Sequence, residues 1–265
     1  MKRLAVALLA VLAACGGQGD RLVVAAGTTL VDSGFMDAVV DRYEATTGST
    51  VSVVGESSAR VVELGRQGEA GLLLTHEPNA LKEFMDEGGS AGSSVAFESR
   101  FVLVGPSNLV AGLDGLTVPK AFEEIAHQSW PFVARGDESG TSIAELAIWE
   151  SLGLDPVGES WYEETGQGMG PTLQVADQRD AFTVADEGTW LETAARLGLA
   201  RAELVGSDLL ANPYSITLVA GQDTGGAQAF FDWLTGVEGA DAVTDVSQLL
   251  FGSDVYRPFS VGSNG

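Results

Sequence analysis

Short apolar runs alternate with stretches of helical periodicity in the first part of the chain. Runs rich in β-favouring residues stand at 21–25, 50–54 and 71–74. Each is followed by a polar loop and then by apolar residues at helical spacing. The predicted helices cover residues 35–47, 59–66 and 78–87. Three repeats of strand, loop and helix predict a parallel α/β sheet.

A second set of these elements follows the strand-like run at 100–104. Its predicted strands are 132–134 and 182–184, and its predicted helices are 142–152, 171–176 and 188–197. A strand at 215–220, a helix at 226–234 and an irregular end complete the chain. This order predicts an α/β protein of two lobes, with 21–104 and 214–265 in lobe 1 and 105–213 in lobe 2. Crossings near Gly105 and near Asn212-Pro213 would form a two-strand hinge, and ligands bind beyond the carboxyl ends of such strands.

The first residues have the layout of a secretory signal peptide. Lys2-Arg3 precede an apolar run at 4–14, which is too short for a membrane-spanning helix. The small residues before Cys15 resemble the bacterial lipobox. This resemblance implies a signal peptide at 1–14, lipid on Cys15 and a lipid-anchored tether at 15–20. An ordinary secretory signal with a chance cysteine is the alternative.

Composition limits the partners. The formal charge is −23, and removal of Lys2 and Arg3 with the signal peptide makes it −25. Such an acidic body is not expected to bind nucleic acid or an anionic membrane surface. With 1 cysteine in the chain, neither an intramolecular disulfide nor a cysteine-ligated metal is expected. A hydrophobic content of 45% is enough for folded cores.

A compact group of anion donors stands out against this acidic background. The loop RGDESGT at 135–141 brings Arg135, Ser139 and Thr141 to the start of a predicted helix. The first N–H groups of a helix lack intrahelical partners, and the macrodipole makes that end positive. Arg135 adds a fork of donors suited to an oxyanion. Together with the amide of Gly140, the loop predicts an anion site.

Three further loops place hydroxyls or glycine amides at predicted helix starts. Converging on one cleft, they would surround an oxyanion with charge-assisted hydrogen bonds. The donors predicted from these loops are Thr28, Thr29, Ser57, Ser58 and the backbone amides of Gly168 and Met169.

Each loop also has an explanation without a ligand. Hydroxyl residues cap helices, SIAE at 142–145 has the pattern of a capping box, and Arg135 can pair with Asp137. The coincidence of four such loops favours binding over capping.

Patterns for catalysis are weak. His76 and His127 lie far apart and in no metal-ligand spacing, and Ser139 lacks the flanking glycines of a nucleophile elbow. DEG at 186–188 indicates the start of a helix more than a carboxylate pair. We therefore expect no enzyme activity, no cofactor and no bare metal cation.

Several longer motifs carry a family resemblance. They are DSG at 32–34, FVLVGP at 101–106, RGDESGT at 135–141, WYEETGQGMG at 161–170, NPYSITLV at 212–219 and AFFDWLT at 229–235. Over nearly the whole mature chain the sequence resembles the tungstate-binding lipoproteins of bacterial tungstate ABC importers. These are two-lobed periplasmic binding proteins of the second structural type.

The resemblance implies a monomeric solute-binding subunit on the extracytoplasmic side of the cell membrane, attached by lipid alone. It would bind tungstate between the lobes and deliver it to an ABC permease with ATPase subunits. Molybdate, phosphate or another small anion is the alternative ligand, and an envelope lipoprotein enzyme or an adhesion module is the alternative class. Ala26-Gly27 replace hydroxyls of the family's first loop, and Glu56 would disfavour an anion if it faced the cleft.

Overall fold

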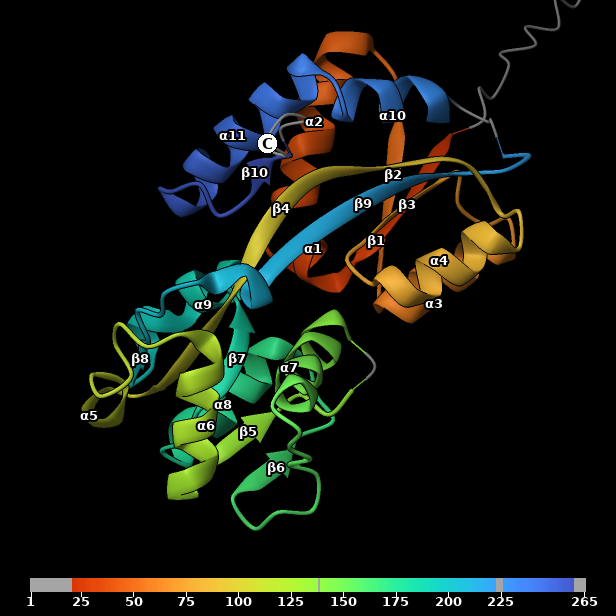
Figure 1. Ribbon diagram of the computed structural model, residues 1–265. Coiled ribbons are helices and arrows are strands. Elements are labelled where there is room, and N and C mark those ends of the chain that lie inside the picture. The colour runs from red at the N-terminus through yellow and green to blue at the C-terminus, as the bar shows by residue number, and fades with distance from the viewer. Residues whose placement is uncertain (1–20, 138, 223–225, 260–265) are drawn as a thin grey trace, which may run out of the picture.

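The computed structural model describes residues 21–137, 139–222 and 226–259. Two lobes are joined by the strands β4 (Ser90–Pro106) and β9 (Ala211–Val219), which run antiparallel beside each other (Figure 1). The predicted α/β fold of two lobes is confirmed. Among the described residues, no helix combines the length and the apolarity that crossing a membrane requires.

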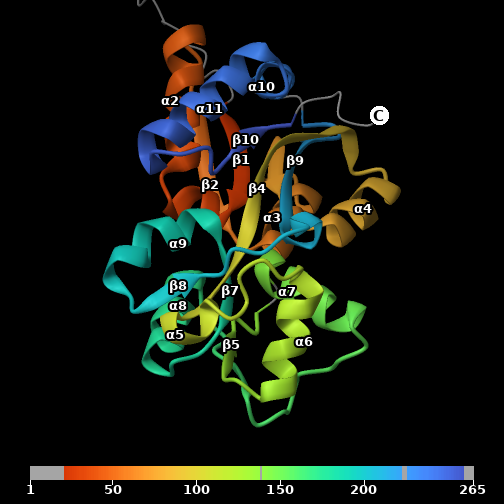
Figure 2. The same ribbon diagram turned by 60° about the vertical axis from the view of Figure 1, so that its left-hand side comes forward.

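Lobe 1 has the strand order β10-β4-β9-β3-β1-β2. Its other strands are β1 (Leu22–Gly27), β2 (Val51–Glu56), β3 (Leu72–Thr75) and β10 (Arg257–Pro258). Its helices are α1 (Thr28–Asp32), α2 (Phe35–Thr47), α3 (Ser58–Arg66), α4 (Pro78–Asp86), α10 (Ala227–Leu234) and α11 (Val237–Phe251). One core, which includes Phe35 and Tyr256, lies beneath α2, α10 and α11. A second, with Leu73 and Phe84, lies beneath α3 and α4 on the other side of the sheet (Figure 2). The parallel strands β1 and β3 are apolar up to their last residues, Gly27 and Thr75, because both faces are covered.

Lobe 2 is built around β5 (Phe132–Ala134), which pairs in parallel with β6 (Tyr162–Glu164). Phe132 also forms an isolated bridge with Phe182, the residue before β7 (Thr183–Asp186). The end of β4 pairs with β7 and with β8 (Leu199–Arg201). Its α-helices are α5 (Ser107–Val110), α6 (Val118–Gln128), α7 (Gly140–Ser151), α8 (Met169–Gln178) and α9 (Glu187–Thr193). Short 3₁₀ turns cover Ala194–Arg196 and Ser207–Leu210. Trp149 is the largest side chain of the lobe's main core and packs edge-on against Phe122 and Phe132.

The chain crosses between the lobes within β4. This strand pairs with β9 as far as Arg100 and with β7 from Phe101 onward. The sequence predicted this crossing near Gly105, and the change of partner lies a few residues earlier, between Arg100 and Phe101. The chain returns to lobe 1 at the start of β9. The reason is that β4 does not end between the lobes but changes its partner there.

Of the elements that differ from the sequence prediction, three have a clear physical reason. Residues 90–99 of β4 were missed because their serines and glycine give a weak apolar signal. The expected irregular end is wrong, because α11 fills it and buries Ala242, Val243 and Val246 on one face. The short helix α1 was missed because it begins directly after β1, without a polar cap.

Candidate functional site

The first candidate site is a cavity of about 250 Å³ between the lobes, which we call the arginine cavity. Lobe 1 contributes the helix α1 and the turn after it, and lobe 2 contributes Arg135, the start of α8 and one side of α9. The lining residues are Thr28, Thr29, Asp32, Ser33, Arg135, Gly168, Met169, Gly170, Pro171, Thr189, Glu192 and Thr193. Five of the residues predicted to bind a ligand thus line one cavity, namely Thr28, Thr29, Arg135, Gly168 and Met169.

The start of α8 gives this cavity backbone donors. Gly168 occupies the N-cap position, and no side chain caps the helix. The first amides of α8 therefore have neither an intrahelical partner nor a capping side chain, while Gly168 and Met169 line the cavity. A helix start of this kind is a favourable place for an anion.

Arg135 lies between β5 and α7 and is 9% exposed. Its Nη2 and Nε donate to Oδ2 of Asp137 at 2.5 and 3.2 Å, so the pairing that the sequence offered as an alternative does form. The Asp137 carboxylate also accepts from Ser139 Oγ at 2.5 Å and from Ser142 Oγ at 3.2 Å. Burial raises the pKa of Asp137, but the bonds from Ser139 and Arg135 outweigh it and hold the pKa below its usual value.

Asp186 is a buried carboxyl that caps α9, a helix whose residues line this cavity. Its Oδ1 accepts from the N–H of Thr189 at 2.8 Å and caps α9, which confirms the prediction that residues 186–188 begin a helix. Its Oδ2 is buried and has no hydrogen-bond partner. Burial raises the pKa of Asp186, and the bonds from Thr189 and the charge of Arg135 oppose the rise.

The other predicted ligands do not line the arginine cavity. Ser57 caps α3 by accepting from the N–H of Arg60 at 3.4 Å, and Ser58 and Thr141 are buried. Gly140 lines a neighbouring cavity.

The predicted capping box at 142–145 is wrong. Ser139 is the N-cap of α7 and accepts from the N–H of Ser142 at 3.3 Å. Glu145 instead points into the lobe and accepts from Trp149 Nε1 at 2.5 Å and from Tyr162 Oη at 3.2 Å. The helix begins at Gly140, two residues before the predicted start, so Glu145 stands in its second turn and is not at the N3 position of a capping box.

The residues that depart from the family pattern are also placed. Ala26 is fully buried in the lobe 1 core, and Gly27 is the N-cap of α1 with open space beside it. Glu56, at the end of β2, is not among the residues that line either of the two interlobe cavities.

The sequence did not reveal the contribution of α9. Thr189 and Thr193 are four residues apart and therefore share a face of the helix, and both line the cavity. Two hydroxyl residues four positions apart, directly after a strand, could have indicated this part of the site. Threonine is common on helix surfaces, however, so the pattern alone does not distinguish a ligand from a surface residue. Asp32 and Ser33 were recognised only as part of a motif.

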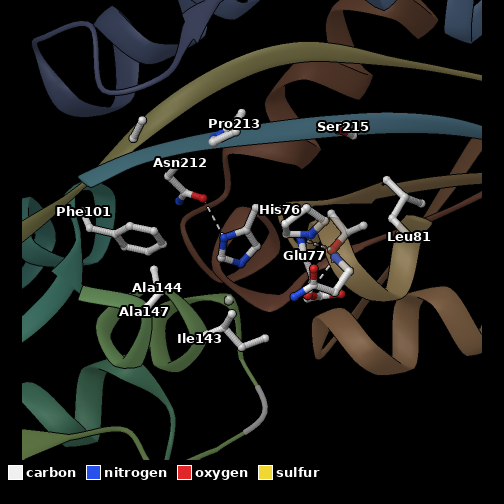
Figure 3. A pocket seen from close by; sticks show the side chains of 15 residues that line it. His76, Glu77, Leu81, Phe101, Ile143, Ala144, Ala147, Asn212, Pro213 and Ser215 are labelled. Atoms are coloured by element: carbon white, nitrogen blue, oxygen red, sulfur yellow. Dashed lines mark hydrogen bonds between the residues drawn. The ribbon is translucent and has the colours of Figure 1, made fainter. Parts of the chain in front are cut away.

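The second candidate site is a cavity of about 320 Å³, which we call the histidine cavity (Figure 3). His76, Glu77 and Leu81 line it from lobe 1, Ile143, Ala144 and Ala147 from α7, and Phe101 and Asn212 from the connecting strands. The His76 Nδ1 lies 2.6 Å from Oδ1 of Asn212, and the ring stacks on Tyr214. Burial lowers the pKa of His76 to about 4, the Asn212 bond opposes this, and Arg135 adds to it.

Two further predictions concern the N-terminal segment and metal binding. The signal peptide at 1–14, lipidation of Cys15 and the tether at 15–20 fall outside the described residues. Among residues 21–137, 139–222 and 226–259, no three His, Cys, Asp or Glu side chains gather as a metal site.

Comparison with known proteins agrees with this architecture. Residues 14–238 match the PBP superfamily domain. A Haloferax volcanii protein named "Putative ABC transporter anion-binding protein" is 33% identical over 94% of this chain and 75% of its own length. The tungstate-binding protein TupA of Peptoclostridium acidaminophilum is 31% identical over 89% of this chain and 85% of its own.

A solved structure has the same arrangement of lobes. The tungstate-binding protein TupA of Desulfovibrio alaskensis G20 superposes with a TM-score of 0.81 at 27% identity, covering 91% of this chain and 99% of that chain. The chain therefore belongs to the PBP superfamily, the periplasmic binding proteins with two lobes. Within that superfamily it belongs to the family that includes the TupA proteins.

Proposed function

We propose that this protein is the extracytoplasmic solute-binding subunit of an ABC importer and that it binds tungstate in the arginine cavity. One observation carries the proposal. Arg135 and the uncapped start of α8 on lobe 2 face the hydroxyl residues Thr28 and Thr29 on lobe 1 across this cavity. A ligand that contacts both lobes stabilises the closed arrangement by its differential affinity for it.

The donors suit a doubly charged tetrahedral anion. Arg135 supplies the formal charge, and the amides of α8 and the hydroxyls of Thr28, Thr29 and Thr189 supply directed hydrogen bonds. Asp32 and Glu192 also line the cavity, so we place the anion on the side of Arg135 and α8. Ser57, Ser58, Ser139, Gly140 and Thr141 stand at the starts of α3 and α7 and do not line this cavity, so the proposed anion contacts do not include them.

The charge state of the ligand separates tungstate from phosphate. A protonated phosphate needs an acceptor, and a carboxylate such as that of Asp137 would be the natural one. That carboxylate already accepts from Arg135, Ser139 and Ser142. A fully deprotonated oxyanion needs no acceptor, which favours tungstate or molybdate over phosphate.

The remaining parts of the proposal follow from the family. We infer that the protein is a monomer without catalytic activity or cofactor, held at the cell membrane by lipid on Cys15. Its closed form would dock on a permease whose ATPase subunits drive import.

A thermal-shift panel tests the proposal. Tungstate, molybdate, sulfate and phosphate are each added to the purified protein, and the unfolding midpoint is measured. A ligand at a hundred times its dissociation constant stabilises the folded state by about 2.7 kcal/mol. We expect tungstate to give the largest shift. An unchanged midpoint with all four anions would exclude an importer of such anions, and a shift with phosphate alone would exclude tungstate.

A further inference from the structure

The two lobes touch at His76 and Gly140. His76 follows β3 in lobe 1, and Gly140 is the first residue of α7 in lobe 2. A Cβ atom at position 140 would lie 2.5 Å from Nε2 and 2.6 Å from Nδ1 of the His76 ring. Atoms do not approach so closely, so the present arrangement of the lobes requires that residue 140 has no side chain.

The backbone of Gly140 does not itself call for glycine. It lies outside the left-handed region that the structure records for Gly136 and Gly166 in nearby loops. In contrast, the requirement at Gly140 comes from the opposite lobe. An alanine there would be acceptable in an isolated lobe 2 and would collide only when the lobes meet.

His76 cannot easily move aside. Its Nδ1 is hydrogen-bonded to Oδ1 of Asn212 (Figure 3). Its ring stacks on Tyr214 with the ring centroids 4.9 Å apart. Asn212 is itself fixed, because its Nδ2 donates to Oη of Tyr214 at 3.3 Å and the residue is 1% exposed. The imidazole is therefore a fixed surface against which α7 comes to rest.

The same group of side chains reaches the arginine cavity. Tyr214 is 0% exposed, and burial raises the pKa of its hydroxyl, while the Thr29 side chain is close enough to it to oppose this rise. Thr29 is one of the two threonines that line the arginine cavity from lobe 1. A continuous path of contacts thus runs from Gly140 through His76, Asn212 and Tyr214 to Thr29.

We propose that His76 is a positioning residue. Its contact with Gly140 sets how far the lobes close, and thereby holds Thr29 and Arg135, in the loop before α7, at the spacing that the oxyanion needs. This inference rests on the proposed function. It assigns His76 no contact with the anion. It also explains why glycine stands at the first position of α7 when the backbone does not require it.

The test uses the full chain with four variants, Gly140→Ala, His76→Ala, the double variant and Gly92→Ala. Gly92 is the control because it lies outside both cavities and a Cβ atom there meets nothing within 4 Å. Tungstate affinity is measured by calorimetry, and compaction on adding tungstate is measured by small-angle X-ray scattering.

We expect Gly140→Ala to weaken tungstate binding by about tenfold or more and to reduce the compaction, because closure is blocked. Removing the His76 ring in the double variant should restore binding to that of His76→Ala. A merely structural defect at position 140 would not be relieved by a second substitution on the opposite lobe. Gly92→Ala should match the wild type.

Two results would overturn the inference: undiminished affinity of Gly140→Ala, or a double variant as weak as Gly140→Ala. If the wild type binds none of the four anions, the proposed function fails instead. In that case scattering from the unliganded proteins still tests the contact, since Gly140→Ala should be more extended than the wild type. Equal scattering profiles would then count against it.

Discussion

Arg135 and Asp137 form a two-point contact in which Nη2 and Nε of the guanidinium both donate to one carboxylate oxygen. The carboxylate also receives hydrogen bonds from Ser139 and Ser142 at the start of α7. Asp137 thus holds a negative charge beside the arginine cavity and fixes the direction in which Arg135 points. The remaining guanidinium N–H groups are the ones available to a ligand.

Replacing Arg135 tests whether it binds the anion. We expect Arg135→Ala to abolish measurable tungstate binding and Arg135→Lys to weaken it by about tenfold or more, because lysine lacks the planar fork. Titration calorimetry measures both. Arg179→Ala is the matched control, since Arg179 lies on the same lobe and makes an exposed ion pair with Glu163. Affinity equal to the wild type in Arg135→Ala would remove Arg135 from the site.

Replacing Asp137 separates its two roles. Asp137→Asn leaves a nearly buried guanidinium without its anion, so the unliganded protein should lose about 1–3 kcal/mol of unfolding free energy. Tungstate would then supply the missing negative charge, and its thermal shift should be larger than in the wild type. Equal shifts in both proteins would mean that Asp137 and the ligand do not share Arg135.

His76 makes stability depend on pH. Its pKa is lowered from 6.5 to about 4, so between these values the unfolded chain binds the proton and the folded protein does not. The unfolding free energy that neutral His76 contributes is present in full above pH 6.5. It falls by up to about 3 kcal/mol as the pH drops to 4. Neighbouring groups include Arg135, Asn212 and Tyr214, and the charge of Arg135 adds to the effect.

Urea unfolding of the wild type and of His76→Gln at pH 4.5 and 7 measures this dependence. We expect the difference between the two pH values to be smaller in the variant, since glutamine keeps a polar side chain but does not titrate. His127→Gln is the control, because His127 is exposed near the end of α6, and this variant should behave as the wild type. The same dependence in all three proteins would contradict the assignment to His76.

Much of the fold could be predicted from the sequence because local signals and tertiary environment agree there. The runs that became β1 and β3 are apolar and flanked by loops, and α2 is bounded by Gly34 and Gly48, both with a φ of 70°. The strand at residues 90–99 was not predicted, because β4 is stabilised there by pairing with β9 and not by its own composition. Helix α11 was not predicted, because its buried face has few large apolar residues and includes Gly239 and Ser247.

The candidate site was predictable only in part. Arg135, Thr28 and Thr29 stand in recognisable loops, and the structure brings them to one cavity. The role of Gly140 could not be predicted, because its reason is the ring of His76 on the other lobe. Nor could the sequence predict that Ser57 and Ser58 do not line the arginine cavity, because a hydroxyl at a helix start has the same local pattern whether it caps the helix or binds a ligand.

Glu145 gives a pH dependence of the opposite sign to that of His76. Burial raises its pKa from 4.5 to about 7, and the bonds from Trp149 and Tyr162 oppose the rise. Between these values the folded protein holds the proton more firmly than the unfolded chain, so the contribution is present below pH 4.5 and is lost as the pH rises to 7. Glu145→Gln stays neutral and should lose less stability than the wild type between pH 5 and 8.

Chemical unfolding at these two pH values measures the effect, which should be on the order of 1–3 kcal/mol. Glu150→Gln is the matched control, because Glu150 is an exposed residue of the same helix, and its stability should follow that of the wild type. Glu145→Gln must also keep the tungstate affinity of the wild type, since Glu145 lies in the lobe 2 core and lines neither cavity. If Glu145→Gln loses as much stability as the wild type between pH 5 and 8, the carboxyl is already ionised at pH 5. Its hydrogen bonds with Trp149 and Tyr162 would then be charge-assisted bonds to a carboxylate.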